Sequence, residues 1–169
     1  MTAASAIAAR EGPSERLAEQ ADRVAAASRA MADRFAAGGR LYVFGSAVAA
    51  ADAQHVAVEF VHPVIVGKPA LPATALTGGG VDHQIRVLAR PGDIALGVSP
   101  APDDDVRAGL DAAAGLGLLT VVLVGDGVEA PADHRLEVSC DDPLVVRELH
   151  VTTYHILWEL VHVFLESAP

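Results

Sequence analysis

Cysteine and basic residues are scarce in this sequence of 169 residues. The single cysteine, Cys140, excludes an intramolecular disulfide and fits a reducing compartment, so we expect a cytoplasmic protein. We interpret Cys140 as a small buried strand residue and not as a nucleophile. The formal net charge is -10, which leaves no basic surface to neutralise phosphates. This balance argues against nucleic acid or an anionic membrane as the main partner.

Long hydrophobic runs are also missing. No stretch approaches eighteen uninterrupted apolar residues, and residues 1–10 lack the basic start and apolar core of a signal peptide. The sequence therefore predicts neither a membrane span nor a secretion signal. Apolar residues are nevertheless abundant at 51%, and this content excludes general disorder. We expect a flexible leader over residues 1–12 and a single domain over residues 13–169.

What is present is a regular alternation of strand and helix patterns. Short apolar runs rich in β-branched residues are bounded by glycine and proline, and stretches with helical spacing follow them. Strands are predicted at 41–44, 73–77, 93–99, 119–125 and 135–140, and helices at 13–37, 47–59, 81–89, 106–116 and 143–166. This alternation indicates an α/β fold, a doubly wound five-stranded parallel sheet sandwiched by helices.

The stretch 41–59 combines a buried strand, a tight turn at Gly45 and Ser46, and a helix. His55 and Glu59 are four residues apart on that helix, so their side chains project from the same face. In parallel α/β sheets, ligands bind beyond the carboxyl ends of the strands, where helices begin. Candidate ligand sites are therefore the turns that follow Phe44, Thr77, Ser99 and Gly125.

Two further features concern helix ends and histidines. Asp103 or Asp104 is expected to be the N-cap of the helix that follows it, because acidic side chains accept the free N–H groups of a first turn. The final helix carries His155, and we interpret its other histidines, His150 and His162, as packing or surface residues.

The order of these segments resembles a sugar isomerase (SIS) domain of the phosphoheptose isomerase type. The most specific motifs are DAQHVAVE at 52–59 and ELHVTTYHIL at 148–157, and the resemblance extends over nearly the whole chain from Arg34 onward. It implies a flavodoxin-like sandwich and a homodimer or homotetramer with sites between subunits. The implied reaction converts sedoheptulose 7-phosphate to a heptose 7-phosphate.

The same resemblance implies roles for individual residues. Glu59 and His155 would move protons between adjacent carbons. Substrate contacts would come from Gly45, Ser46, Asp52 and Ser99. Either no cofactor is present, or His55, Glu59 and His155 hold zinc. Arg147 stands where the family has a fourth, glutamine ligand, and a cation at that position opposes metal binding.

The chain departs from the family where phosphate would be held. The family's STSGNS cradle corresponds to Ser99-Pro100-Ala101-Pro102-Asp103-Asp104, in which prolines remove backbone donors and aspartates add negative charge. The turn after the first strand has lost a serine at Ala49 and gained bulk at Val48. These changes predict impaired binding of a phosphosugar.

Two classes of function follow from this mixture. The protein is either an isomerase that acts on a sugar or sugar phosphate by an acid and base pair, or a non-catalytic SIS domain. In the second class it would be a sugar sensor, a protein-binding scaffold or the partner subunit of a complete paralogue.

Overall fold

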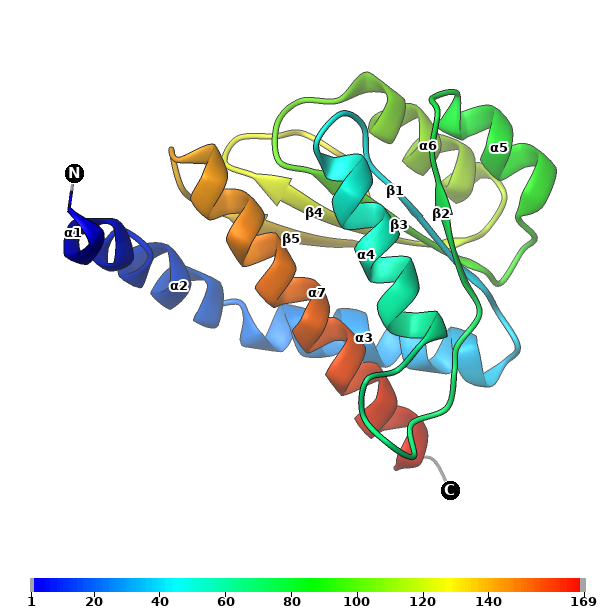
Figure 1. Ribbon diagram of the computed structural model, residues 1–169. Coiled ribbons are helices and arrows are strands. Elements are labelled where there is room, and N and C mark those ends of the chain that lie inside the picture. The colour runs from blue at the N-terminus through cyan, green and yellow to red at the C-terminus, as the bar shows by residue number, and fades with distance from the viewer. Residues whose placement is uncertain (1, 168–169) are drawn as a thin grey trace.

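A five-stranded parallel sheet forms the centre of the computed structural model, which describes residues 2–167 (Figure 1). The sheet order is β2-β1-β3-β4-β5, and every neighbouring pair is parallel. Its strands are β1 (Leu41–Phe44), β2 (Ala73–Leu76), β3 (Ile94–Ser99), β4 (Leu119–Gly125) and β5 (His134–Val138). This is the flavodoxin-type doubly wound order, so the predicted fold class is confirmed.

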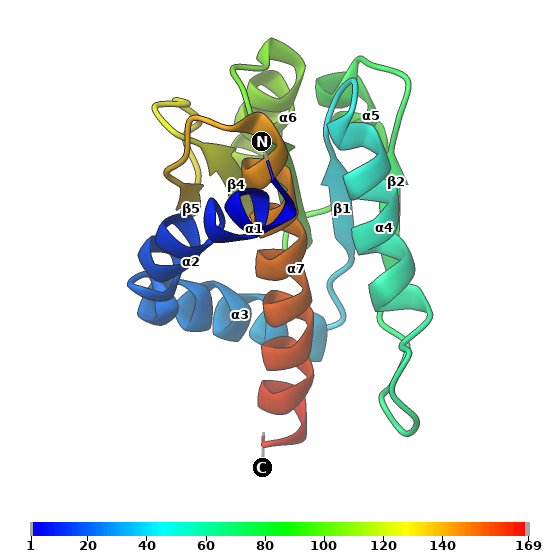
Figure 2. The same cartoon turned by 60° about the vertical axis from the view of Figure 1, so that its left-hand side comes forward.

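Helices cover both faces of the sheet. They are α1 (Ala3–Ala8), α2 (Glu11–Ala18), α3 (Ala21–Ala36), α4 (Ala49–Val61), α5 (Val81–Leu88), α6 (Asp104–Gly115) and α7 (Pro143–Glu166). Helices α3, α4 and α7 pack on one face, and α5 and α6 pack on the other (Figures 1 and 2). Within residues 2–167 no helix combines the length and the apolar character that crossing a membrane requires.

Alternation along the strands divides the interior into two cores. Val43 packs with α3, α4 and α7, whereas its neighbour Phe44 packs with α5 and α6. Val121 and Val122 of β4 divide in the same way. Because each strand is buried on both faces, it reads as a continuous apolar run. Each fully buried side chain of this size contributes about 1.5–3 kcal/mol relative to exposure.

The N-terminal segment differs from the single long helix that its spacing predicts. Helix α1 lies within the stretch for which we expect a flexible leader, and α2 is separated from α3 at Gln20. The Gln20 amide donates to the carbonyl of Glu137 (2.6 Å) and accepts from the same residue's N–H (3.2 Å). This side chain thus satisfies backbone groups at the open edge of β5, at the point where α2 and α3 are separated. The division into a leader and one domain stays a prediction.

Local boundaries follow the sequence closely elsewhere. Asp103 is the N-cap of α6, as expected, since its carboxylate accepts the N–H groups of Asp105 and Val106. Cys140 is half-buried and lies two residues beyond the end of β5, so the prediction of a buried strand residue is wrong.

Candidate functional site

The turn between β1 and α4 brings the first helix face into position. Gly45 has no room for a side chain, because a Cβ there would lie 2.9 Å from the Val98 carbonyl oxygen and from the Ala49 side chain. Ala47 is held in the left-handed region with φ 49. Val48 is exposed, so its bulk lies toward solvent. From this tight turn, α4 runs back from the carboxyl end of the sheet. The face of α4 that carries His55 and Glu59 is accessible to solvent.

A carboxylate and two imidazoles meet between α4 and α7. Glu59 Oε1 lies 3.1 Å from His55 Nε2 and 3.9 Å from His155 Nε2. The candidate ligand atoms of the three residues all lie within 4.8 Å of one another. Glu59 is mostly covered, with 16% of its side chain exposed, while both histidines reach solvent. The structure thus joins three residues from two sequence motifs in one solvent-facing cluster, called the His55 cluster below.

Tyr154 of α7 contacts the His55 cluster through His55. Its hydroxyl lies 2.7 Å from His55 Nδ1, and burial raises the pKa of this phenol, with the charges of Asp52 and Glu59 adding to the effect. A phenol that stays protonated donates, so Nδ1 accepts and Nε2 of His55 carries the proton that it donates to Glu59. Tyr154 is not among the residues that the sequence predicts for a site, because only the packing of α7 on α4 brings its hydroxyl to His55.

Asp52 and Arg147 form an ion pair across the same two helices. Arg147 Nε lies 3.1 Å from Asp52 Oδ2, and one of its terminal nitrogens lies 3.3 Å from Oδ1. The hydrogen bond to Asp52 raises the pKa of the Arg147 guanidinium, and Asp52 itself is buried. Both oxygens of the predicted substrate contact are therefore used within the protein. Asp52 therefore matches the positive charge of Arg147, which we expected to oppose metal binding.

The other two histidines of α7 are packing residues, as predicted. His150 is buried and its Nε2 donates to the carbonyl of Val124 (3.1 Å), and burial lowers its pKa. His162 is buried as well, with its two ring nitrogens next to the carbonyls of Trp158 and Pro69. Neither joins the His55 cluster.

Ser46 and Ser99 lie in the loops at the carboxyl ends of β1 and β3. The Ser46 hydroxyl donates to the carboxylate of Asp103, and the Ser99 hydroxyl donates to the carbonyl of Ala101 (2.8 Å). The second loop packs closely on the next strand, because a Cβ at Gly125 would lie 2.2 Å from the carbonyl oxygen of Pro100. Both predicted serine contacts thus have partners within the protein.

The donor set of the His55 cluster suits a metal ion. Two imidazole nitrogens and one carboxylate oxygen form the three-ligand set found at catalytic zinc, which leaves a position open. For Nε2 of His55 to bind an ion, its proton would have to move to Nδ1, which would then donate to the Tyr154 hydroxyl; metal-binding histidines have such an outer hydrogen bond on their second nitrogen. His55, Glu59 and His155 are therefore a possible metal-binding group.

Comparison with known proteins places these features in a family. The family model described as SIS domain matches residues 8–100. The phosphoheptose isomerase of Solidesulfovibrio magneticus is 37% identical over 168 residues, covering 89% of this chain and 82% of the relative. That of Nitratidesulfovibrio vulgaris is 36% identical, covering 87% and 80%.

Solved structures agree on the fold. The structure of a phosphoheptose isomerase from Francisella tularensis has a TM-score of 0.82 at 23% identity, and it covers 96% of this chain and 100% of that one. The phosphoheptose isomerase of Neisseria gonorrhoeae also has a TM-score of 0.82, at 22% identity, covering 94% and 95%.

Proposed function

Because this chain belongs to the SIS domain family, with phosphoheptose isomerases among its relatives, we propose that it is an aldose–ketose isomerase that acts on a heptose-class sugar. The observation that carries the proposal is the meeting of Glu59 with His155 in a cluster that solvent reaches. Isomerisation of this kind needs one group that takes a proton from carbon and another that serves the oxygens. A part-covered carboxylate beside an imidazole supplies both.

Glu59 is the proposed base. It removes the proton from the carbon next to the carbonyl and returns it to the adjacent carbon, through an enediol. His155 gives a proton to the carbonyl oxygen and receives one from the neighbouring hydroxyl. No net oxidation occurs, because the hydrogen removed at one carbon is restored at the other.

His55 and Tyr154 position the base in this proposal. The Tyr154 hydroxyl donates to Nδ1 of His55, so Nε2 keeps its proton and donates to Glu59 Oε1. The chain Tyr154 to His55 to Glu59 fixes the direction in which the carboxylate points. Groups held by such supporting hydrogen bonds keep a productive geometry.

Zinc remains a proposed alternative to a reaction without a cofactor. His55, Glu59 and His155 would be its ligands, and a bound ion would act as a Lewis acid that polarises the sugar carbonyl. Dialysis against a chelator, followed by metal analysis and an activity assay, separates the two forms of the proposal.

The test of the isomerase proposal is exchange of a carbon-bound proton. Purified protein is incubated in deuterium oxide with sedoheptulose and, separately, with sedoheptulose 7-phosphate, and deuterium at the carbon next to the carbonyl is followed by NMR. We expect exchange with at least one sugar and a loss of about 10²–10⁴-fold in Glu59→Gln. The matched control is Glu166→Gln, at an exposed ion pair with Lys68. Undiminished exchange in Glu59→Gln overturns the role of this residue.

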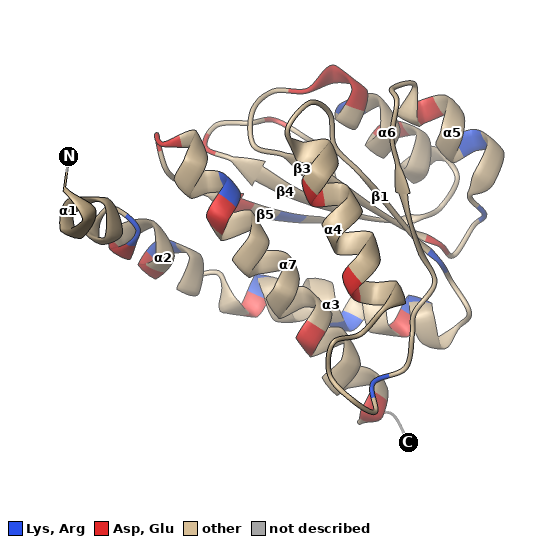
Figure 3. Ribbon diagram, in the orientation of Figure 1, with Lys and Arg blue, Asp and Glu red and all other residues tan. Residues whose placement is uncertain are grey.

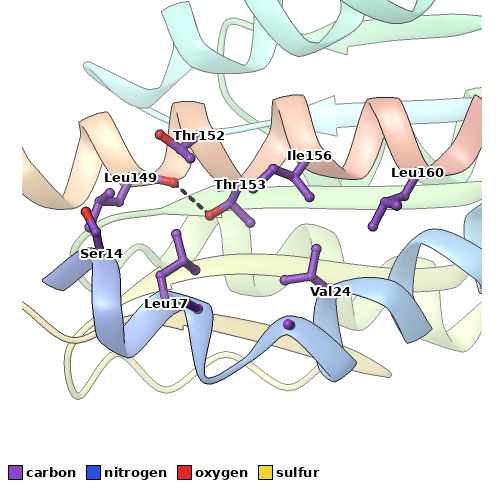
Figure 4. A pocket seen from close by; sticks show the side chains of 10 residues that line it. Ser14, Leu17, Val24, Leu149, Thr152, Thr153, Ile156 and Leu160 are labelled. Atoms are coloured by element: carbon purple, nitrogen blue, oxygen red, sulfur yellow. Dashed lines mark hydrogen bonds between the residues drawn. The ribbon is translucent and has the colours of Figure 1, made fainter.

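Self-association is the second part of the proposal. An apolar groove of about 300 Å³ lies between α2, α3 and α7. Figure 4 shows Leu17 and Val24 on one side of it, facing Ile156 and Leu160 of α7 on the other. Such a groove suits a second copy of the chain, so the proposed assembly is a homodimer or homotetramer. The proposed compartment of the protein is the cytoplasm. A monomer by light scattering at micromolar concentration would contradict the assembly.

A further inference from the structure

The loops that follow β1 and β3 meet at the carboxyl edge of the sheet. The first contains Ser46 and leads into α4, and the second runs from Ser99 to Asp103 and leads into α6. In parallel α/β proteins this position gathers helix N-termini and hydroxyls that bind an anionic group of the ligand. The groups that lie at this position therefore influence whether the substrate can carry an anionic group there.

The carboxylate of Asp103 lies at this position. One oxygen accepts the N–H groups of Asp105 (3.0 Å) and Val106 (3.1 Å), two of the donors that the first turn of α6 leaves without an intrahelical partner. The other oxygen accepts the hydroxyl of Ser46 from the neighbouring loop. A single internal anion thus takes a helix N-terminus and the hydroxyl beside it, the same donors that an external anion would need.

Several other donors that could serve an anion near this loop are also used or missing. The Ser99 hydroxyl donates to the carbonyl of Ala101, and Pro100 and Pro102 have no N–H. The N–H of Val81, at the start of α5, donates to the carboxylate of Asp105 (3.2 Å). An added phosphate would have to displace these internal bonds.

The local charge has the wrong sign for an anion. Asp103, Asp104 and Asp105 follow one another where α6 begins, and Figure 3 shows acidic colour along this stretch. Arg107 donates to Asp104 (2.9 Å), at the exposed side of the helix, and not to Asp103. A phosphate close to Asp103 would be repelled by like charge, and the low dielectric of a part-buried loop strengthens such repulsion.

We propose that Asp103 is a specificity-determining residue that replaces a substrate phosphate, so that the sugar bound at this site is uncharged at the end lying against the β1 and β3 loops. The substrate class is a neutral heptulose and the corresponding aldose. This inference rests on the proposed isomerase function, but it concerns binding and can be read without turnover.

The test is calorimetric binding of two matched sugars. Wild-type protein is titrated with sedoheptulose and with sedoheptulose 7-phosphate, and the same is done with Asp103→Ser, which keeps a residue that caps helices while removing the charge. We expect wild type to prefer the neutral sugar by about tenfold or more, and Asp103→Ser to shift the ratio toward the phosphate by about tenfold or more. Asp103→Asn, which keeps the shape and the cap, serves if the serine variant does not fold.

Asp104→Ser is the matched control, because it removes an equal charge one residue away, at an almost fully exposed side chain. We expect it to leave the ratio near that of wild type. Tighter binding of the phosphate by wild type overturns the inference, as does an equal shift in Asp104→Ser or binding of neither sugar. Deuterium exchange keeps the two proposals apart: exchange that favours the phosphate refutes only the role of Asp103, whereas binding without exchange of either sugar refutes only the isomerase.

Discussion

The His55 cluster and the loops at the carboxyl edge of the sheet differ in how their polar groups are used. In the His55 cluster, carboxylate and imidazole groups reach solvent and keep capacity for a ligand. In the loops, the hydroxyls of Ser46 and Ser99 are bonded to acceptors within the protein. The groups suited to proton transfer and the groups suited to holding an anion therefore lie on separate elements, and one set can change while the other stays.

The physical basis of this separation is the kind of element that carries each set. Glu59 and His155 project from long helices whose opposite faces are packed on the sheet, so their positions are fixed by the core. Loops make fewer core contacts and accept new residues more easily. If Asp103 has the proposed role, substitution there would alter substrate choice without moving the proposed acid and base.

The largest effect is expected from removal of the proposed acid of the His55 cluster. In His155→Gln we expect the rate of sugar isomerisation to fall about 10²–10⁴-fold, with the melting temperature unchanged, because general acid catalysis supplies that factor. Steady-state assays and a thermal melt measure both. His83→Gln, on an exposed position of α5, is the control. A rate close to wild type would assign the proton transfer elsewhere.

The next largest effect is a loss of stability when the ion pair between Asp52 of α4 and Arg147 of α7 is removed. Asp52→Asn removes the charge that pairs with Arg147, and we expect the free energy of unfolding to fall by about 1–3 kcal/mol. Urea denaturation measures this change. Asp82→Asn, in the exposed pair with Arg86, should change stability much less. Equal effects of the two substitutions would show that burial of Asp52 adds nothing.

A smaller effect on the reaction rate is expected when the hydroxyl of Tyr154 is removed. In Tyr154→Phe the ring stays and the donor to His55 Nδ1 is lost, so we expect kcat to fall about tenfold with KM little changed. Nitrogen chemical shifts of His55 should show the Nε2–H tautomer in wild type and a mixture in the variant. Tyr42→Phe, which removes a hydroxyl bonded to the Leu88 carbonyl, is the control. An unchanged tautomer would refute the positioning role.

His150 lies on the buried side of α7, whereas His155 of the His55 cluster lies on the exposed side. Burial lowers its folded-state pKa, so on acidification the unfolded chain takes up a proton at an ordinary value of about 6.5 while the folded chain resists it. Stability should therefore fall as pH drops through that value, by at most about 1.4 kcal/mol per pH unit from this residue. Urea melts near neutral and mildly acidic pH should show a weaker dependence in His150→Gln. The same dependence in both proteins would contradict this assignment.

The smallest effect is expected in the turn after β1. Ala47 has φ 49, a conformation that is costly for a residue with a Cβ. Ala47→Gly should stabilise the protein by up to about 1 kcal/mol. The relief of strain is partly offset because glycine loses more backbone entropy on folding than alanine does. Ala51→Gly, within α4, should destabilise it instead. Loss of stability in Ala47→Gly would show that the turn is not strained.

Much of the fold is predictable because strands buried on both faces give unbroken apolar runs. The run 119–125 matches β4 to the residue, and residues 143–166 match α7. The break at Gln20 was not predictable, because nothing local ends that helix and the partner of its amide, Glu137, is far away in sequence. The pairing of His55 with Glu59 follows from helical spacing, whereas the approach of His155 was available only through the family resemblance.

The amino-acid sequence alone predicts the alternating elements, the shared face of His55 and Glu59, and the acidic, proline-rich loop after Ser99, because each depends on residues close together along the chain. Three contacts become visible only in the folded chain: Tyr154 with His55, Arg147 with Asp52, and Ser46 with Asp103. Those contacts join residues about 57–99 positions apart. The packing of α4, α6 and α7 on the sheet decides which residues meet in these contacts. The local sequence around each residue does not predict that packing.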